Sequence, residues 1–229
     1  MQAEKHAVKH GVKMKKIILL TGFEPFNQET INPSWEAVRS LQGWHEGDFV
    51  VHARQLPCVF GHANKVMHQA VEELQPSIVI AVGQAGGRPD LSIERIAINI
   101  DDAPIADNQM RQIVDQPIVN GGPAAYFSTL PIKAIVHALR EAGLPASVSQ
   151  TAGTFVCNHV FYGLMHQAHE WGTTMRAGFI HIPYLPQQAA AHPGFASMKL
   201  DDMVEGLRIA IRTTLAHTVD VREAGGLTH

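Results

Sequence analysis

The stretch Lys16-Ile17-Ile18-Leu19-Leu20-Thr21-Gly22 decides the fold class of this chain. An uninterrupted apolar run that ends at a Thr-Gly turn is typical of a strand buried on both faces of a sheet. Similar runs follow at residues 49–51, 78–82, 147–149 and 179–182. Each of them predicts a further strand of one sheet.

Patterns typical of helices lie between these runs. Asn32 followed by Pro33 predicts a helix start, because Asn caps free N–H groups and Pro fits the first helical position. We expect this helix to end near Leu41, and apolar periodicity predicts others near residues 60–75, 131–142, 157–171 and 201–217. Alternating strands and helices predict an α/β fold whose mostly parallel, twisted sheet is covered by helices on both faces.

Composition limits the classes of protein and partner. The 229 residues are 45% hydrophobic and 17% charged, which is enough for one large core and unlike a disordered chain. The net charge of −3 gives no basic field, so we expect no nucleic-acid partner. The two cysteines, Cys58 and Cys157, form no disulfide framework and fit a reducing cytoplasm. No apolar run approaches the ~20 residues that span a bilayer, so neither a membrane partner nor a signal peptide is expected.

The two ends of the chain differ from its middle. Residues 1–15 carry Lys5, Lys9, Lys13 and Lys15 with little apolar periodicity, which predicts a flexible basic arm. We expect one domain over residues 16–218 and a C-terminal tail over residues 219–229.

Cys157 is the first candidate for chemistry. It follows a turn of small residues, Thr151-Ala152-Gly153-Thr154, and lies at the start of a predicted helix. There the free N–H groups and the helix dipole favour an anion, which would lower the pKa of the thiol and make it a nucleophile. The alternative is a small apolar residue at the start of a core-facing helix stripe. Cys58 has no such turn before it and is interpreted as structural.

A cysteine nucleophile needs a base, and His181 is the best placed of the 14 histidines. It lies at the end of the apolar run 179–182, and strand ends and helix starts border one crevice in open α/β sheets. We therefore expect His181 and Cys157 on the same rim. His159 lies two residues after Cys157 and would point to another side of the helix. The alternative for His181 is a satisfied core histidine.

Glu94 is the candidate third residue. Alternation over residues 91–100 places it on one strand face with the isoleucines at 96, 98 and 100. A buried carboxylate needs a partner, and holding an imidazole would supply one. The alternative is that Glu94 pairs with Arg95 or Arg88 at the surface.

Three other patterns carry weaker signals. The run Gly83-Gln84-Ala85-Gly86-Gly87-Arg88 matches neither standard phosphate-loop motif, so it predicts a tight turn, although a phosphate- or nucleoside-binding protein stays as a rival. His166 and His169 have no further ligand motif, so no metal site is expected. Asp101-Asp102 is interpreted as a turn.

Five segments in this order carry a resemblance: residues 21–26 with 32–35, 83–88, 94–99, 151–159 and 181–186. From about Lys16 to Ala216 the chain resembles the pyrrolidone-carboxylate peptidases, also called pyroglutamyl peptidase I, a family of cysteine peptidases. The resemblance implies a single three-layer α/β/α domain with a catalytic triad of Cys157, His181 and Glu94. It also implies no cofactor, a cytoplasmic location and a homotetramer.

The implied reaction removes an N-terminal pyroglutamyl (5-oxoprolyl) residue from peptides through a thioester acyl-enzyme. By the resemblance, the Cys157 thiolate attacks, His181 protonates the leaving amine and Glu94 holds the imidazole tautomer. The Gln84 carbonyl would accept the ring N–H, in an apolar pocket formed by Phe23, Phe26, Ile105, Phe155 and Val156.

The chain departs from the family pattern at two places, and the first of them, Pro104, motivates an alternative. Pro104 stands where the family usually has Arg, and Asn27-Gln28 replace Gly-Gly after Phe26. The loop after Phe26 could then take another course, since glycine favours positive φ. The alternative is a weakly active or inactive member of the family that binds pyroglutamyl peptides.

Overall fold

The computed structural model describes residues 16–226, and a seven-stranded sheet with the strand order β2-β3-β1-β4-β9-β5-β8 runs through its centre. Parallel pairing joins β1 to β3 and β4, β4 to β9, and β5 to β8, while β2 and β5 run antiparallel to β3 and β9. The mostly parallel sheet that the sequence predicts is thus confirmed. Its strands are β1 (Lys16–Phe23), β2 (His45–Glu46), β3 (Phe49–Leu56), β4 (Ile78–Gln84), β5 (Leu91–Glu94), β8 (Ala146–Ser149) and β9 (Arg176–Ile182).

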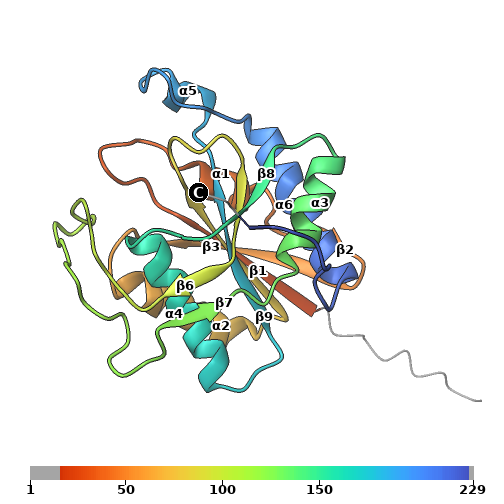
Figure 1. Cartoon of the computed structure of the whole chain (residues 1–229), viewed down its shortest axis with the longest axis horizontal. Helices are drawn as coiled ribbons and strands as arrows, with labels where there is room; N and C mark the ends of the chain where they lie inside the picture. Colours follow the sequence, from red (N-terminus) through yellow and green to blue (C-terminus); the bar gives the residue numbers. More distant parts are fainter. Residues whose placement is uncertain (1–15, 227–229) are drawn as a thin grey trace, which may run out of the picture.

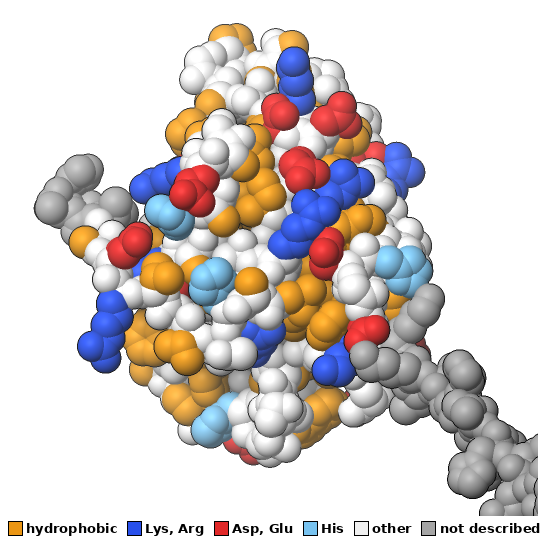
Figure 2. Space-filling view, turned by 90° about the vertical axis from the view of Figure 1, so that its right-hand side faces the viewer, with side chains coloured by type: hydrophobic (Ala, Val, Ile, Leu, Met, Phe, Trp, Pro, Cys, Tyr) orange, Lys and Arg blue, Asp and Glu red, His pale blue; other side chains and the backbone are white. Residues whose placement is uncertain are grey.

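Helices cover both faces of this sheet (Figure 1). On one face lie α1 (Pro33–Arg39), α3 (Ile132–Glu141) and α6 (Leu200–Ala216), and on the other lie α2 (His62–Leu74) and α4 (Val156–Glu170). The short α5 (Pro186–Ala189) follows β9. The chain therefore forms a three-layer α/β/α domain. Acidic and basic side chains are interspersed on the face that Figure 2 shows.

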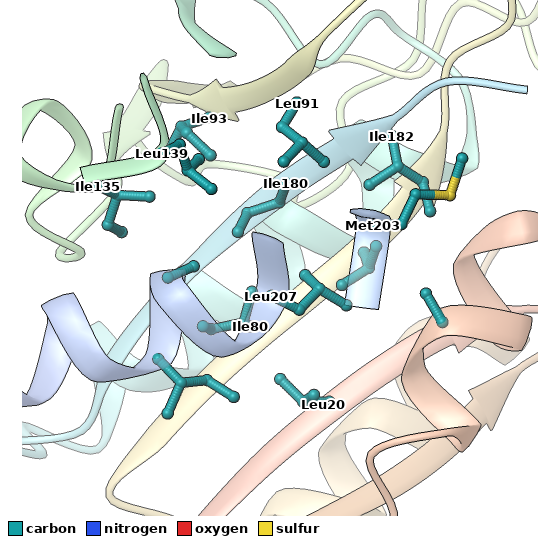
Figure 3. Packing of buried hydrophobic residues seen from close by; sticks show 14 of the residues in the cluster. Leu20, Ile80, Leu91, Ile93, Ile135, Leu139, Ile180, Ile182, Met203 and Leu207 are labelled. Atoms are coloured by element: carbon teal, nitrogen blue, oxygen red, sulfur yellow. The ribbon is translucent and has the colours of Figure 1, made fainter. Parts of the chain in front are cut away.

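Strand residues alternate between two hydrophobic clusters. Leu20, Ile80 and Ile180 pack against Met203 and Leu207 of α6 (Figure 3). Their neighbours along the strands, among them Leu19, Val79 and Phe179, join the cluster under α2 and α4. Burial of both faces explains the continuous apolar runs in the sequence.

The start of α1 is fixed to the end of β1. Asn32 caps the helix by accepting a hydrogen bond from the Ser34 N–H, and Pro33 is the first helical residue, as predicted. The Ser34 hydroxyl in turn accepts from the Phe23 N–H at 2.9 Å. A Cβ on Gly22 would lie 2.6 Å from the Ser34 carbonyl oxygen, so this contact requires glycine. It positions the loop of residues 24–31, which carries Phe26.

The prediction of a single strand over residues 91–100 is wrong. The chain leaves the large sheet after Glu94. The Arg95 N–H makes the last bond to β8, at the Ser149 carbonyl (2.9 Å), whereas the Arg95 carbonyl accepts from the Ser128 N–H outside that sheet. Residues Ile96–Ile98 form β6, which pairs only with β7 (Ala125–Phe127) in a separate two-stranded sheet. Glu94 thus shares no continuous strand face with the three isoleucines.

The other predicted elements match the structure with shifts of up to five residues at their ends, while β2, β7 and α5 had no signal in the sequence. The expected basic arm, residues 1–15, lies outside the described residues. The segment after α6 packs against α3, since the Asp220 carboxylate accepts from the Lys133 and Ala134 N–H groups.

Candidate active site

Three neighbouring strands place His181 beside Cys157. His181 of β9 is in register with Gly83 of β4 and with Ser92 of β5. Registered residues on adjacent strands point to the same face, at a strand spacing of about 4.8 Å. A Cβ on Gly83 would lie 2.9 Å from Cys157 Sγ, so the thiol of α4 rests against β4 one strand from His181. The structure therefore brings this predicted pair together.

Glu94 completes the group from the end of β5. Its carboxyl oxygen Oε1 lies 2.7 Å from His181 Nδ1, and its side chain is fully buried. A carboxylate accepts, so Nδ1 carries the hydrogen and Nε2 keeps its lone pair. Within residues 16–226 no side chain or backbone group hydrogen-bonds to His181 Nε2. His181 can thus accept a proton at Nε2.

Arg88 is a fourth member that the sequence named only as a surface partner of Glu94. Its Nη1 donates to Glu94 Oε1 at 2.7 Å, and its Nη2 donates to the Thr151 carbonyl at 2.9 Å. The two alternatives for Glu94, an imidazole or Arg88, are therefore both present, on one buried oxygen. The sequence could not show that the turn after β4 folds back far enough for both.

The Cys157 thiol lies in the first turn of α4, where no side chain caps the helix. The predicted lowering of its pKa is wrong for this state. Burial, with a smaller contribution from the nearby Glu94 carboxylate, raises the pKa of Cys157 to about 12, while Arg88 acts in the opposite direction. The thiol therefore needs a base to remove its proton. Burial also raises the pKa of Cys58, which fits its structural interpretation.

The predicted pocket residues occupy two kinds of place. The half-buried rings of Phe26 and Phe155 lie 6.1 Å apart, and Phe60 meets Phe155 edge-on at 5.3 Å. Phe23 and Val156 are instead buried in the hydrophobic cluster behind them. Phe60 had no functional signal in the sequence beyond its apolar character.

Gln84 and Ile105 lie in the segments that border this group. Gln84 ends β4, in register with Ile182 directly after His181. Ile105 is half-buried in the loop that follows Asp102. That loop is tied to the turn before α4, because the Asp102 N–H donates to the Thr154 carbonyl and the Thr154 hydroxyl donates to the Asp102 carbonyl.

A second histidine pair lies on the same helix. His159 Nδ1 lies 2.8 Å from Asp101 Oδ2, and its Nε2 accepts from the Gly61 N–H at 2.9 Å. Asp101 also forms a backbone bridge with Gln116 and is buried, so it is more than the expected turn. As predicted, His159 points away from Cys157 toward other partners.

The structure also addresses the departures and the weaker motifs. Asn27 and Gln28 adopt φ values of 52° and 65°, so these side chains accept the left-handed conformation that we expected them to resist. Pro104 is exposed.

The rival phosphate loop is contradicted, because β4 leads through residues 85–90 into β5 and not into a helix. His166 pairs with the Tyr126 hydroxyl. Within residues 16–226 no three His, Cys, Asp or Glu side chains are placed to hold a metal ion. Across that same range, no helix combines the length and apolarity needed to cross a membrane.

Comparisons with known proteins agree with this geometry. The family model of pyroglutamyl peptidase matches residues 15–217. A pyrrolidone-carboxylate peptidase of Cupriavidus pinatubonensis is 66% identical over 93% of this chain and 100% of its own length. One from Bacillus anthracis is 55% identical, with the same coverage of each chain.

Solved structures give the same result. The crystal structure of pyroglutamyl peptidase I from Bacillus amyloliquefaciens superimposes with a TM-score of 0.89 at 48% identity, covering 92% of this chain and 100% of that one. This similarity does not favour the alternative of a weak or inactive member. The chain belongs to the pyroglutamyl peptidase family, and it is a cysteine peptidase that removes N-terminal pyroglutamate from peptides.

Proposed function

We propose that Cys157 is the nucleophile of this peptidase, that His181 is its general acid and base, and that Glu94 orients His181. The observation that carries the proposal is the 2.7 Å contact between Glu94 Oε1 and His181 Nδ1, with the thiol one strand away. This contact fixes the tautomer in which Nε2 can take a proton. The arrangement supports assigning a nucleophile, a base and an orienting group, as in a hydrolytic triad.

The first half of the reaction forms a thioester. His181 Nε2 takes the proton of the Cys157 thiol as the sulfur attacks the pyroglutamyl carbonyl carbon. This order follows from the raised pKa of the thiol, which leaves it protonated before substrate binds. The imidazolium then gives that proton to the nitrogen of the next residue, the C–N bond breaks, and the shortened peptide leaves.

The second half releases pyroglutamate. His181 takes a proton from water, whose oxygen attacks the thioester carbon, and the proton returns to the departing sulfur. The carbonyl oxygen becomes negative in both halves. Backbone N–H groups at the start of α4, where no side chain acts as a cap, are suited to stabilise it.

The pocket proposal concerns specificity. A pyroglutamyl group has no charged amine, so an apolar site with a few backbone partners suits it. The facing rings of Phe26 and Phe155 support a pocket for the lactam, with Phe23 and Val156 behind them and Ile105 on the neighbouring loop. The Gln84 carbonyl would accept the ring N–H.

Two further proposals follow from the family resemblance. We infer a homotetramer, and exposed apolar side chains such as Met110 and Phe127 offer surface for subunit contacts. We also infer a cytoplasmic location, which suits the two unpaired thiols of Cys58 and Cys157.

The test of the residue roles uses chromogenic amides of pyroglutamate, proline and glutamate. We expect hydrolysis of the pyroglutamyl amide alone. Cys157→Ser should abolish it, while Cys58→Ser should retain most of it. Full activity in Cys157→Ser would overturn the assignment of the nucleophile, and cleavage of the prolyl amide at a similar rate would overturn the pocket.

A further inference from the structure

One charged side chain enters the active site from the turn after β4. Arg88 donates to Glu94 Oε1 at 2.7 Å, to Ser149 Oγ at 3.2 Å and to the Thr151 carbonyl at 2.9 Å. Its own side chain is about one-third exposed, whereas Glu94 is fully buried. The guanidinium therefore links solvent, a buried carboxylate and the turn that leads to Cys157.

Glu94 needs this cation. Its Oε2 is buried and has no hydrogen-bond partner in residues 16–226, so Oε1 carries every contact of the carboxylate. A buried carboxylate whose only partner is a neutral imidazole is poorly compensated for its lost hydration. Arg88 supplies the opposite charge at the same oxygen that holds His181.

Arg88 also contacts the turn that leads to the proposed nucleophile. Thr151 begins the turn before α4, and its carbonyl accepts from both Arg88 and the Ser149 hydroxyl. The planar fork of an arginine suits this double contact, because its two terminal nitrogens reach the carboxylate and the carbonyl separately, whereas a lysine ammonium would have to reach both from one nitrogen. The positions of His181 and of the Cys157 helix are thus tied to one side chain.

The turn that carries Arg88 is itself held in place. The Arg88 N–H bonds the Ala85 carbonyl at 3.2 Å, and the Gly86 backbone lies so close to the Tyr184 ring that a Cβ would clash with it. The guanidinium therefore projects from a packed support, as a positioning group must.

We propose that Arg88 is a positioning residue of this peptidase, which holds the buried Glu94 carboxylate in alignment with His181 and fixes the turn before Cys157. The proposal rests on the triad proposed above. Arg88 touches no reacting atom in it and acts through Glu94 and Thr151.

The experiment compares Arg88→Gln and Arg88→Lys with the control Arg95→Gln. Arg95 is the next arginine in the sequence, but its guanidinium donates to the Gly225 carbonyl, outside the proposed active site. We expect kcat/KM to fall about 10- to 100-fold in Arg88→Gln, less in Arg88→Lys, and little in Arg95→Gln. KM should change less than kcat.

The pH profile separates positioning from mere support of the fold. The titratable and charged groups that meet here are Arg88, Glu94 of β5, His181 of β9 and Cys157 of α4. Removing a positive charge from beside the active site disfavours negative and favours positive charge there, so the acid limb of kcat/KM should move to higher pH in Arg88→Gln. Arg88→Lys, which keeps the charge, should move it less.

A double variant tests whether Arg88 acts through Glu94. Arg88→Gln added to Glu94→Gln should cost little beyond Glu94→Gln alone. Additive losses with an unshifted pH profile, or activity of Arg88→Gln within about threefold of the parent, would overturn the proposal. If Arg88→Gln fails to fold, the pH profile of Arg88→Lys is used instead. An unshifted profile in Arg88→Lys would then overturn the proposal. Full activity in Glu94→Gln would instead contradict the triad itself.

Discussion

Two buried histidine–carboxylate pairs have nearly the same geometry, and we propose acid–base chemistry for only one of them. His181 meets Glu94 at 2.7 Å and His159 meets Asp101 at 2.8 Å, in both cases through Nδ1. Both rings are buried, with side-chain exposures of 5% and 8%. By distance and burial the two pairs cannot be told apart.

The difference lies at the other nitrogen of each ring. His159 Nε2 accepts the Gly61 N–H at 2.9 Å, so both of its nitrogens are occupied. His181 Nε2 has no such partner in the described part of the chain, and its strand neighbour Gly83 lies against the Cys157 sulfur. The comparison teaches that a carboxylate only orients an imidazole. An available nitrogen beside a nucleophile makes it a base.

The largest expected effect is the difference in kcat between two variants that each lack one of the imidazole rings. His181→Ala should lower kcat by about 10²- to 10⁴-fold, since proton transfer to and from the thiol, the amine and water is lost. His159→Ala should leave kcat per folded molecule within about tenfold and lower stability. Steady-state kinetics beside thermal unfolding of both variants measures this, and an equal loss of kcat in the two would remove the distinction.

Substituting the two carboxylates should give the same contrast between a catalytic and a structural pair, with smaller effects on kcat. Glu94→Gln should lose less kcat than His181→Ala, because the amide oxygen can still accept from Nδ1. Asp101→Asn should lower the free energy of unfolding by about 1–3 kcal/mol, since the buried charged acceptor of His159 is replaced by a neutral amide. Urea unfolding and kcat on each variant check both statements. A catalytic defect in Asp101→Asn as large as that in Glu94→Gln would show that the second pair also serves the reaction.

The smallest effect concerns a third histidine that has no hydrogen-bonded carboxylate in residues 16–226. Burial lowers the pKa of His68 from 6.5, with His166 acting in the same direction and Glu72 and the Gly163 carbonyl against it. The folded protein thus binds this proton less readily than the unfolded chain does. Stability is fully present above about pH 6.5 and falls as the pH drops toward the lower pKa of the folded state.

His68→Gln removes that titration. Its free energy of unfolding should therefore depend less on pH between about 6.5 and 5 than that of the parent, by at most one proton. His62→Gln, a change at an exposed position of the same helix, is the matched control. Identical slopes in the parent and His68→Gln would contradict the burial argument.

The layered fold and the proximity of Cys157 and His181 could be predicted from the sequence, because both follow from local patterns. Apolar runs predicted the strands, and strand ends and helix starts share one rim. The break after Glu94 had no local signal, since the Arg95 carbonyl turns away from the large sheet to a hydrogen bond with the distant Ser128 N–H.

Local sequence patterns also could not predict the thiol pKa or the contacts of the buried carboxylate. The helix start predicted a lowered thiol pKa, but burial by the surrounding layers and the Glu94 carboxylate raise it. The two contacts on Glu94 Oε1 likewise depend on how the turn of residues 85–90 folds back over β5. Desolvation and long-range contacts of this kind depend on the whole fold and not on residue spacing.

The central claim is that His181 activates Cys157 to form a thioester. The most direct measurement is peptide mass spectrometry on enzyme quenched in acid during turnover of a pyroglutamyl ester, with Cys58→Ser and Cys157→Ser as controls. We predict a pyroglutamyl group on the peptide that contains Cys157, present in Cys58→Ser and absent in Cys157→Ser. An acyl group on another residue, or turnover by Cys157→Ser at the parent rate, would contradict the account.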